Sequence, residues 1–135
     1  DGLVIALVGG DRLVGFDAKT GARRWQTPVG RGESERWAVL HGDDVLVAGD
    51  GPLVAVDAAT GAARWRAVVG NAVGQPVAAG ERVYVATGDR LVALDRASGR
   101  QVWASARVQP AAGPLVTSDR VVVATRDRGL LGFAP

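Results

Sequence analysis

The sequence predicts an all-β fold, a β-propeller of four-stranded antiparallel blades, with about 3.5 blades in this chain and therefore a partial ring. Three observations predict it. One motif recurs three times, at intervals of 40 and 38 residues. Runs such as Leu3–Val8 and Val121–Ala124 are apolar on both faces of a strand, so both faces must be covered. No segment combines helical periodicity with helix caps, so the covering layers are other sheets.

The repeated unit leads from an apolar strand through an Asp-x-x-Thr/Ser-Gly turn to a tryptophan. It reads LVGFDAKTGARRW at 13–25, LVAVDAATGAARW at 53–65 and LVALDRASGRQVW at 91–103. A fourth copy begins at 129–134 and stops before its turn and its tryptophan. A two-sheet sandwich is the alternative fold, but it gives no reason for a period of 38 to 40 residues.

Four short strands are expected in each complete repeat, because turn sequences separate four apolar runs. In the second repeat these runs are 37–40, 45–48, 53–56 and 63–68, and in the third they are 76–79, 83–86, 91–94 and 101–104. Residues 1–135 are expected to form a single propeller segment. Its expected blades are 2–30 (the last three strands of a blade), 31–70, 71–109 and 110–134 (the first three strands of a blade).

The turn and the tryptophan both have structural explanations. An Asp carboxylate at the head of the turn accepts bonds from backbone N–H groups further along, and glycine supplies the positive φ that closes the loop. A tryptophan four residues after the glycine offers a large flat surface for packing between blades. We therefore assign a structural role to twelve residues: Asp17, Thr20, Gly21, Trp25, Asp57, Thr60, Gly61, Trp65, Asp95, Ser98, Gly99 and Trp103.

These units resemble the tryptophan-docking motif of the PQQ-like (quinoprotein-type) β-propeller repeats, and the resemblance covers essentially the whole chain. The family pattern has Ala two residues before the Asp, which Ala55 and Ala93 match and Gly15 does not. It often has Lys after the glycine of the turn, where this chain has Ala22, Ala62 and Arg100. Both departures are mild.

The resemblance implies a ring of six to eight blades, in which the first strand of each blade lines the channel and the tryptophan-bearing strand lies outermost. About half a ring is present, the chain starts at Asp1, and it contains no Met. We therefore expect further blades as partners, from the same polypeptide or from a second copy of the chain. Because open sheet edges are an aggregation liability, the first arrangement is favoured.

Two functional classes share these repeats. One consists of non-catalytic propellers that serve as scaffolds or sensors and bind proteins or ligands. The other consists of dehydrogenases that bind PQQ and Ca²⁺. The first class is favoured, with no enzyme activity, no catalytic residue, no cofactor and no metal site expected, and with a bacterial, extracytoplasmic (periplasmic or cell-surface) location implied by the resemblance. The alternative is a fragment of a PQQ/Ca-dependent quinoprotein dehydrogenase.

Isolated polar residues offer little catalytic chemistry. His41 lacks a neighbouring nucleophile or carboxylate, so a surface turn is favoured over a general base. The adjacent pair Asp43 and Asp44 occupies the same turn, and a solvated hairpin is favoured over a calcium ligand set. The chain has no Cys, which excludes thiolate metal sites, disulfides and a cysteine nucleophile.

One set of loops forms a candidate binding face. Arginines lie in loops expected on the same side of the disc, together with a tryptophan outside the repeat position: Arg12, Arg31, Trp37, Arg90, Arg126 and Arg128. Bidentate arginine pairs suit an acidic protein or peptide partner, and Trp37 could anchor an interface or line the channel mouth. Interleaved aspartates offset the arginines, and the net charge is only +2, so no nucleic-acid binding is expected. No apolar run reaches about 18 residues, so no direct membrane insertion is expected.

Overall fold

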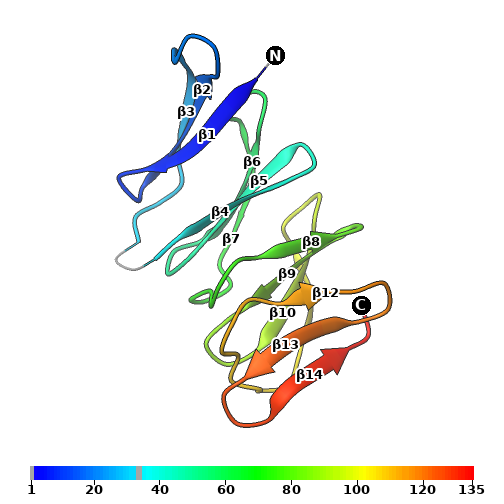
Figure 1. Ribbon diagram of the computed structural model, residues 1–135. Coiled ribbons are helices and arrows are strands. Elements are labelled where there is room, and N and C mark those ends of the chain that lie inside the picture. Colours follow the sequence, from blue (N-terminus) through cyan, green and yellow to red (C-terminus); the bar gives the residue numbers. More distant parts are fainter. Residues whose placement is uncertain (1, 33–34) are drawn as a thin grey trace.

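The computed structural model describes residues 2–32 and 35–135, which form fourteen strands in four antiparallel sheets and no helix (Figure 1). The first sheet holds β1 (Leu3–Val8), β2 (Arg12–Asp17) and β3 (Arg23–Pro28). The second holds β4 (Trp37–His41), β5 (Asp44–Ala48), β6 (Leu53–Asp57) and β7 (Ala63–Ala67). The third holds β8 (Val77–Ala79), β9 (Arg82–Ala86), β10 (Leu91–Asp95) and β11 (Gln101–Ala104). The fourth holds β12 (Leu115–Val116), β13 (Val121–Thr125) and β14 (Gly129–Phe133).

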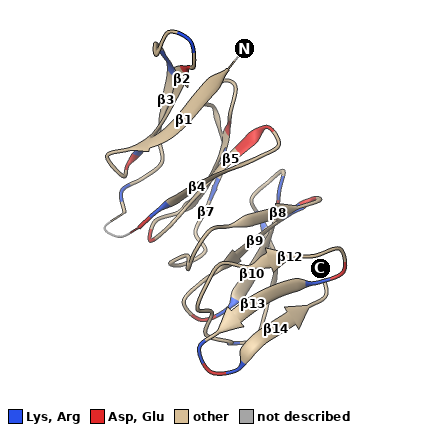
Figure 2. Cartoon of the chain, in the orientation of Figure 1, with Lys and Arg blue, Asp and Glu red and all other residues tan. Residues whose placement is uncertain are grey.

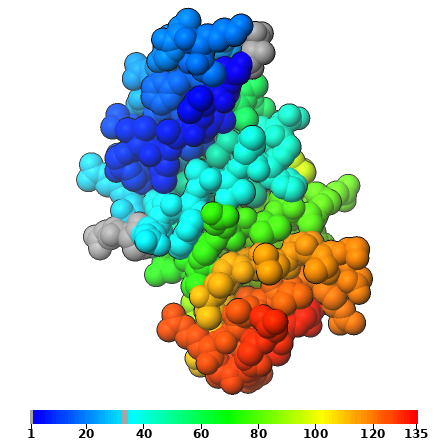
Figure 3. All heavy atoms as spheres, in the orientation of Figure 1, coloured from blue at the N-terminus to red at the C-terminus, as the bar shows by residue number. Residues whose placement is uncertain are grey.

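Each sheet is a meander in which strands that follow one another in the sequence also pair. The tryptophan-bearing strands β3, β7 and β11 each form one edge of their sheet, and β4, β8 and β12 form the opposite edge. The four sheets follow one another along the molecule in sequence order, from the blue N-terminal strands to the red C-terminal ones (Figure 3). Sheets of this size stacked face to face match the predicted all-β fold.

The strand registers show which positions of the repeats correspond. Ile5 of β1 pairs with Gly15, and the same position is taken by Leu46 in β5, Tyr84 in β9 and Val122 in β13. In the three sheets with a tryptophan strand, the register shifts at the residue opposite the tryptophan, which is Gly15, Ala55 or Ala93. A small residue there leaves room for the indole.

Hydrophobic cores lie between successive sheets. Between the first two, Leu13 packs with Val45, Val47, Val54 and Val56. Two further clusters join the second sheet to the third and the third to the fourth. This arrangement explains why the central strands are apolar on both faces, since each inner sheet has a neighbour on either side.

The two end sheets are covered on one side only. Val4 in β1 is 54% exposed, whereas its counterparts Val45, Val83 and Val121 are at most 2% exposed. At the other end Leu130 in β14 is 74% exposed. Charged residues gather at strand ends and loops, with both signs interleaved (Figure 2).

Candidate functional site

Two of the three repeat tryptophans, Trp25 and Trp65, join their sheet to the turn of the next sheet. The Trp25 indole N–H donates to the carbonyl of Ala58, at 3.2 Å, and the Trp65 indole donates to the carbonyl of Arg96, at 2.7 Å. Both acceptors directly follow the Asp of the next repeat's turn. Thr27 strengthens the first junction, because its hydroxyl donates to the carbonyl of Gly61.

Each turn on which a tryptophan docks needs its glycine for two reasons. Gly61 and Gly99 have backbone φ angles of +75° and +71°. Residues other than glycine rarely adopt such angles. A Cβ atom on either would also lie 2.5 Å from the Cδ2 atom of the tryptophan that packs on it, Trp25 or Trp65 respectively. The equivalent Gly21 has a φ of +70° but no atom within 4 Å of its Cβ position. The first turn thus has the docking conformation without a docked indole.

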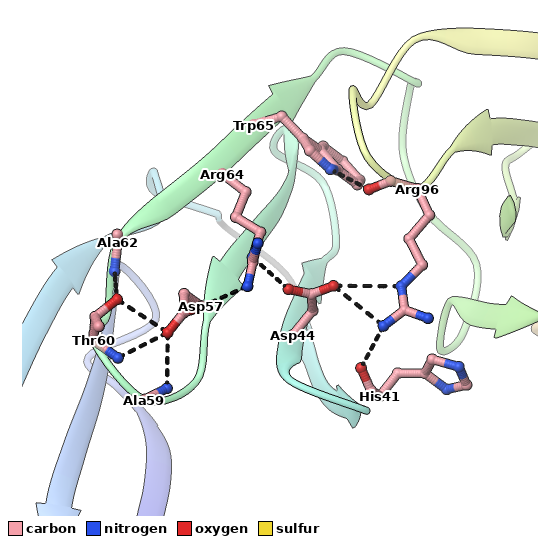
Figure 4. Close-up of polar contacts among 9 residues, drawn as sticks. All are labelled: His41, Asp44, Asp57, Ala59, Thr60, Ala62, Arg64, Trp65 and Arg96. Carbon is pink, nitrogen blue, oxygen red and sulfur yellow. Dashed lines mark hydrogen bonds and ion pairs between the residues drawn. The ribbon is translucent and has the colours of Figure 1, made fainter. Parts of the chain in front are cut away.

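Each Asp at the head of a turn holds the turn closed. The Asp57 carboxylate accepts from the backbone N–H groups of Ala59 and Thr60, at 3.0 and 2.9 Å, and from the Thr60 hydroxyl at 3.0 Å (Figure 4). The Thr60 bonds are the main reason why the pKa of Asp57 lies below its ordinary value. Asp17 and Asp95 make the same kind of contacts, and their pKa values are lowered too, chiefly by bonds from Thr20 and Ser98 respectively.

Trp103 makes a different contact. Its ring meets Phe133 of β14 edge to face, with ring centroids 5.5 Å apart and an interplanar angle of 63°. Phe133 lies on the last strand of the fourth sheet, so this pair also packs one sheet on the next. The two other repeat tryptophans instead reach a turn carbonyl.

Asp44 differs from the sequence expectation. The hairpin was expected to be solvated, but only Asp43 is exposed, and Asp44 is buried, with 8% exposure. Its carboxylate lies 2.6 Å from Nε of Arg64 and 3.3 Å from both Nε and Nη2 of Arg96 (Figure 4). Arg64 also pairs with Asp57 at 2.6 Å. The result is a chain of four charged side chains across the second and third sheets.

This chain of charges has a structural role. Arg96 lies in the turn that receives Trp65, and its guanidinium also donates to the carbonyl of His41, at 3.2 Å. The Asp44 contact and the indole bond therefore hold the same turn from two sides. At the positions equivalent to Asp44 the other sheets have Leu3, Arg82 and Arg120, and at those equivalent to Arg96 they have Ala18 and Ala58.

Replacing Asp44 with Asn should lower the free energy of unfolding by about 1–2 kcal/mol. The change removes the buried charge opposite two arginines, but both arginines are partly exposed, so the loss stays below the 3–5 kcal/mol of a fully buried pair. Urea denaturation at low salt measures it. The matched control is Asp43→Asn in the same hairpin, which should change stability by less than about 0.5 kcal/mol. Equal effects of the two substitutions would contradict the assignment.

The arginines of the candidate binding face pair mainly with neighbouring aspartates. Their loops lie mostly on the left of the ribbon in Figure 1, where β1 leads into β2 and β13 into β14. Arg12 pairs with Asp11 at 3.3 Å, Arg90 with Asp89 at 3.3 Å and Arg128 with Asp127 at 3.4 Å. Two others, Arg31 and Arg126, are exposed. The candidate binding face thus carries three local Arg–Asp ion pairs together with two exposed arginines.

Arg36 is a residue whose role the sequence did not reveal. Its guanidinium donates to the carbonyls of Gly10, at 2.9 Å, and Val29, at 2.9 Å, and also bonds that of Gly30. It therefore fastens the β1–β2 loop to the segment after β3. Burial lowers the pKa of this guanidinium, against the opposing effect of the charge of Asp50. Trp37, the next residue, is half-buried at the start of β4.

Within residues 2–32 and 35–135, no group of three or more His, Cys, Asp or Glu side chains is placed to hold a metal ion. The repeat carboxylates Asp17, Asp57 and Asp95 already accept bonds from their own turns. These three carboxylates are thus engaged within their own turns. The same described residues contain no helix long and apolar enough to cross a membrane.

Stacked antiparallel meanders, joined by tryptophans that dock on Asp-x-x-Thr/Ser-Gly turns, define a β-propeller of PQQ-like repeats. Comparison with known families agrees with this class. Residues 9–135 match the family described as outer membrane protein assembly factor BamB, and the chain belongs to that family. The resemblance inferred from the repeats is thus confirmed.

Solved structures agree on the fold. BamB from Moraxella catarrhalis is 27% identical, with a TM-score of 0.76 over 98% of this chain and 42% of the BamB chain. The computationally designed Ika4 protein is 13% identical, with a TM-score of 0.79 over 99% of this chain and 86% of its own. A europium-containing methanol dehydrogenase is 20% identical, with a TM-score of 0.58 over 87% of this chain and 25% of its own. The chain spans less than half the length of that BamB. No significant match was found among curated protein sequences.

Proposed function

We propose that this chain is a non-catalytic propeller segment that binds proteins or ligands as a rigid scaffold in an extracytoplasmic compartment. The observation that carries the proposal is membership of a family described as an outer membrane protein assembly factor. Assembly of proteins is a binding task. Partners of the whole protein would then include components of the machinery that assembles outer membrane proteins.

The contacts of the polar residues support a scaffold. The Asp residues of the repeats close their own turns, and Asp44 joins two sheets through Arg64 and Arg96. Side chains committed to such bonds are poor acids, bases or ligands, because another role would break the contacts that hold the turns. Exposed arginines such as Arg31 and Arg126 remain as candidates for contact with an acidic partner.

The alternative is a fragment of a quinoprotein dehydrogenase. It rests on the PQQ-like repeats, since the likeness to methanol dehydrogenase at 20% identity shows the fold alone. Titration of the chain with PQQ and Ca²⁺ separates the two functions. The scaffold predicts no saturable binding and no dye-linked oxidation of alcohols. Saturable PQQ binding that depends on Ca²⁺ would overturn the proposal in favour of the dehydrogenase fragment.

The scaffold also predicts an effect of the arginine face. Purified outer-membrane assembly components from the source organism should bind the chain, and Arg31→Glu combined with Arg126→Glu should weaken that binding, most strongly at low salt. The matched control is Arg23→Glu combined with Arg100→Glu, two exposed arginines at the turns on the other side of the sheets. Equal losses in both double variants would argue against this face.

A further inference from the structure

The turn carboxylate of the third repeat lacks an ion pair that the first two repeats have. The Oδ2 atom of Asp17 pairs with Arg24, and the Oδ2 atom of Asp57 pairs with Arg64 at 2.6 Å. Each of these arginines directly precedes the tryptophan of its own repeat. In the third repeat that position holds Val102, whose side chain has no hydrogen-bond donor. The third turn therefore has the carboxylate of this pair without the guanidinium.

Asp95, the carboxylate in question, uses one oxygen to close its own turn. Its Oδ1 atom accepts from the backbone N–H of Ser98 at 2.8 Å and from the Ser98 hydroxyl at 2.7 Å. The pKa of Asp95 is lowered chiefly by these bonds, and least by the charge of Arg100. Among the residues that the structure describes, Asp95 has no ion-pair partner. A cation can therefore pair with Oδ2 and leave the turn bonds intact, as Arg64 does at Asp57.

Asp95 lines a pocket between the second and third sheets. The pocket has a volume of about 470 Å³, and its charged lining residues are Asp44, Arg64, Glu81, Asp95 and Arg96. Figure 4 shows Arg64 and Arg96 on either side of Asp44. Both sheets contain all four strands, and each packs against a further sheet on either side. The pocket is therefore an inner feature of the stack and depends on neither end of the chain.

The charges around this pocket leave a surplus of negative charge. The chain of four charged side chains that runs from Asp57 to Arg96 holds two carboxylates and two guanidinium groups, so it is neutral as a unit. Glu81 lies outside it, in the β8–β9 hairpin, and is exposed. Its backbone carbonyl accepts from the N–H of Arg96 at 2.8 Å, which fixes Glu81 beside the turn of Asp95. Within the described ranges, the Glu81 carboxylate forms no ion pair. Two carboxylates thus remain for a cation.

The first two repeats show which cation suits this place. In both, an arginine side chain brings a guanidinium to the Oδ2 atom of the turn carboxylate. A guanidinium stays charged at every physiological pH, and its planar array of N–H groups matches carboxylates. Bonds in which both partners are charged are also stronger than neutral ones. A guanidinium bound at Asp95 has further N–H donors for Glu81.

We propose that the pocket between the second and third sheets binds an arginine side chain of a partner protein, whose guanidinium pairs with Oδ2 of Asp95 and with the Glu81 carboxylate. The partner thus supplies the arginine that Val102 replaces in this repeat. The inference rests on the proposed binding function and gives it a second site, on the side of the sheets opposite the candidate binding face. There the arginines belong to this chain, whereas here the arginine belongs to the partner.

Two peptides that differ only in charge test the proposal. Acetyl-Gly-Arg-Gly-amide carries the guanidinium, and the same peptide with citrulline has a neutral group of nearly the same shape. In NMR titrations of the ¹⁵N-labelled full chain at low salt, the arginine peptide should shift the amide signals of residues 80–82 and 95–97 saturably. The citrulline peptide should bind at least about tenfold more weakly, and added salt should weaken binding of the arginine peptide.

Substitutions in the protein locate the site. Val102→Arg should weaken binding of the arginine peptide at least about tenfold, because the chain's own guanidinium would then occupy Asp95. The matched control is Val102→Gln, which adds a long side chain without charge and should have a much smaller effect. Glu81→Gln should also weaken binding, whereas Asp119→Asn, in the equivalent hairpin of the fourth sheet, should leave it unchanged. Circular dichroism checks that each variant folds.

Three results would overturn the proposal: equal binding of the two peptides, no saturable binding, or binding that Val102→Arg leaves unchanged. Free arginine is a further comparison, because its own carboxylate would lie close to Glu81 and Asp95 and should weaken binding. If free arginine binds more tightly than the peptide, the pocket takes a small molecule and the proposed protein partner is wrong. The scaffold function fails separately, by Ca²⁺-dependent binding of PQQ.

Discussion

Replacing Gly99 with Ala is expected to lower the free energy of unfolding by about 2–5 kcal/mol. Two costs add at this position. The left-handed backbone, with a φ of +71°, costs a residue with a side chain about 1–2 kcal/mol. The new methyl group also meets the Trp65 ring, 2.5 Å from Cδ2, and overpacking of this kind costs about 1–3 kcal/mol. Urea denaturation of the variant and the original chain measures the sum.

Gly21→Ala is the matched control, because the chain contains the same turn without a docked indole. Gly21 has a φ of +70° and no atom within 4 Å of its Cβ position. It should therefore show the backbone cost alone, about 1–2 kcal/mol. In a Trp65→Ala background the extra cost at Gly99 should disappear, because the two residues interact directly. Equal losses at Gly21 and Gly99 in the original chain would show that the indole does not press on the turn.

Replacing Trp65 with Ala should cost about 3–5 kcal/mol, the usual range for truncating a large buried aromatic residue. Trp65 is 8% exposed and packs in the core between the second and third sheets. Its indole N–H also donates to the carbonyl of Arg96, at 2.7 Å. Truncation opens a cavity and leaves that carbonyl without its donor. Thermal and urea denaturation followed by circular dichroism measure the loss.

The control for this truncation is Trp65→Phe. It keeps most of the ring and removes the N–H donor, so it should cost clearly less than Ala and report mainly the hydrogen bond, about 1 kcal/mol, plus a small packing defect. A loss below about 1 kcal/mol for Trp65→Ala would contradict the burial of this indole between sheets. Similar losses for Ala and Phe would instead place most of the effect on the bond to Arg96.

Much of the fold could be predicted from the sequence, because its signals are local and repeated. The Asp57 turn closes through bonds to Ala59 and Thr60, two and three residues away, so the motif itself carries the geometry. A fixed spacing from Asp to tryptophan then predicted that Trp25 and Trp65 pack between sheets. Both indoles do reach the next turn.

The junction at Asp44 could not be predicted in the same way. Its partner Arg96 lies 52 residues away, and neither an Asp at position 44 nor an Arg at position 96 is shared among the repeats, so no periodicity connects them. Comparing equivalent positions of the repeats could have pointed to this ion pair. The other repeats have Leu or Arg where the second repeat has Asp44, and the first two have Ala where the third has Arg96. Arg36 was missed for a similar reason, because its acceptors are backbone carbonyls, which no sequence pattern marks.

The docking of tryptophans on turns gives the stack a polarity. In both junctions the indole comes from the earlier sheet and the turn from the later one, so the two ends of the segment are chemically different. Among the described residues, the Gly21 turn has the receptor conformation with no indole packed on it, whereas the outer side of the last sheet exposes Leu130. A further blade that used the same docking contact would therefore join in one orientation only. Head-to-tail contacts of this kind produce a closed ring when the rotation at each junction closes, and an open stack when it does not.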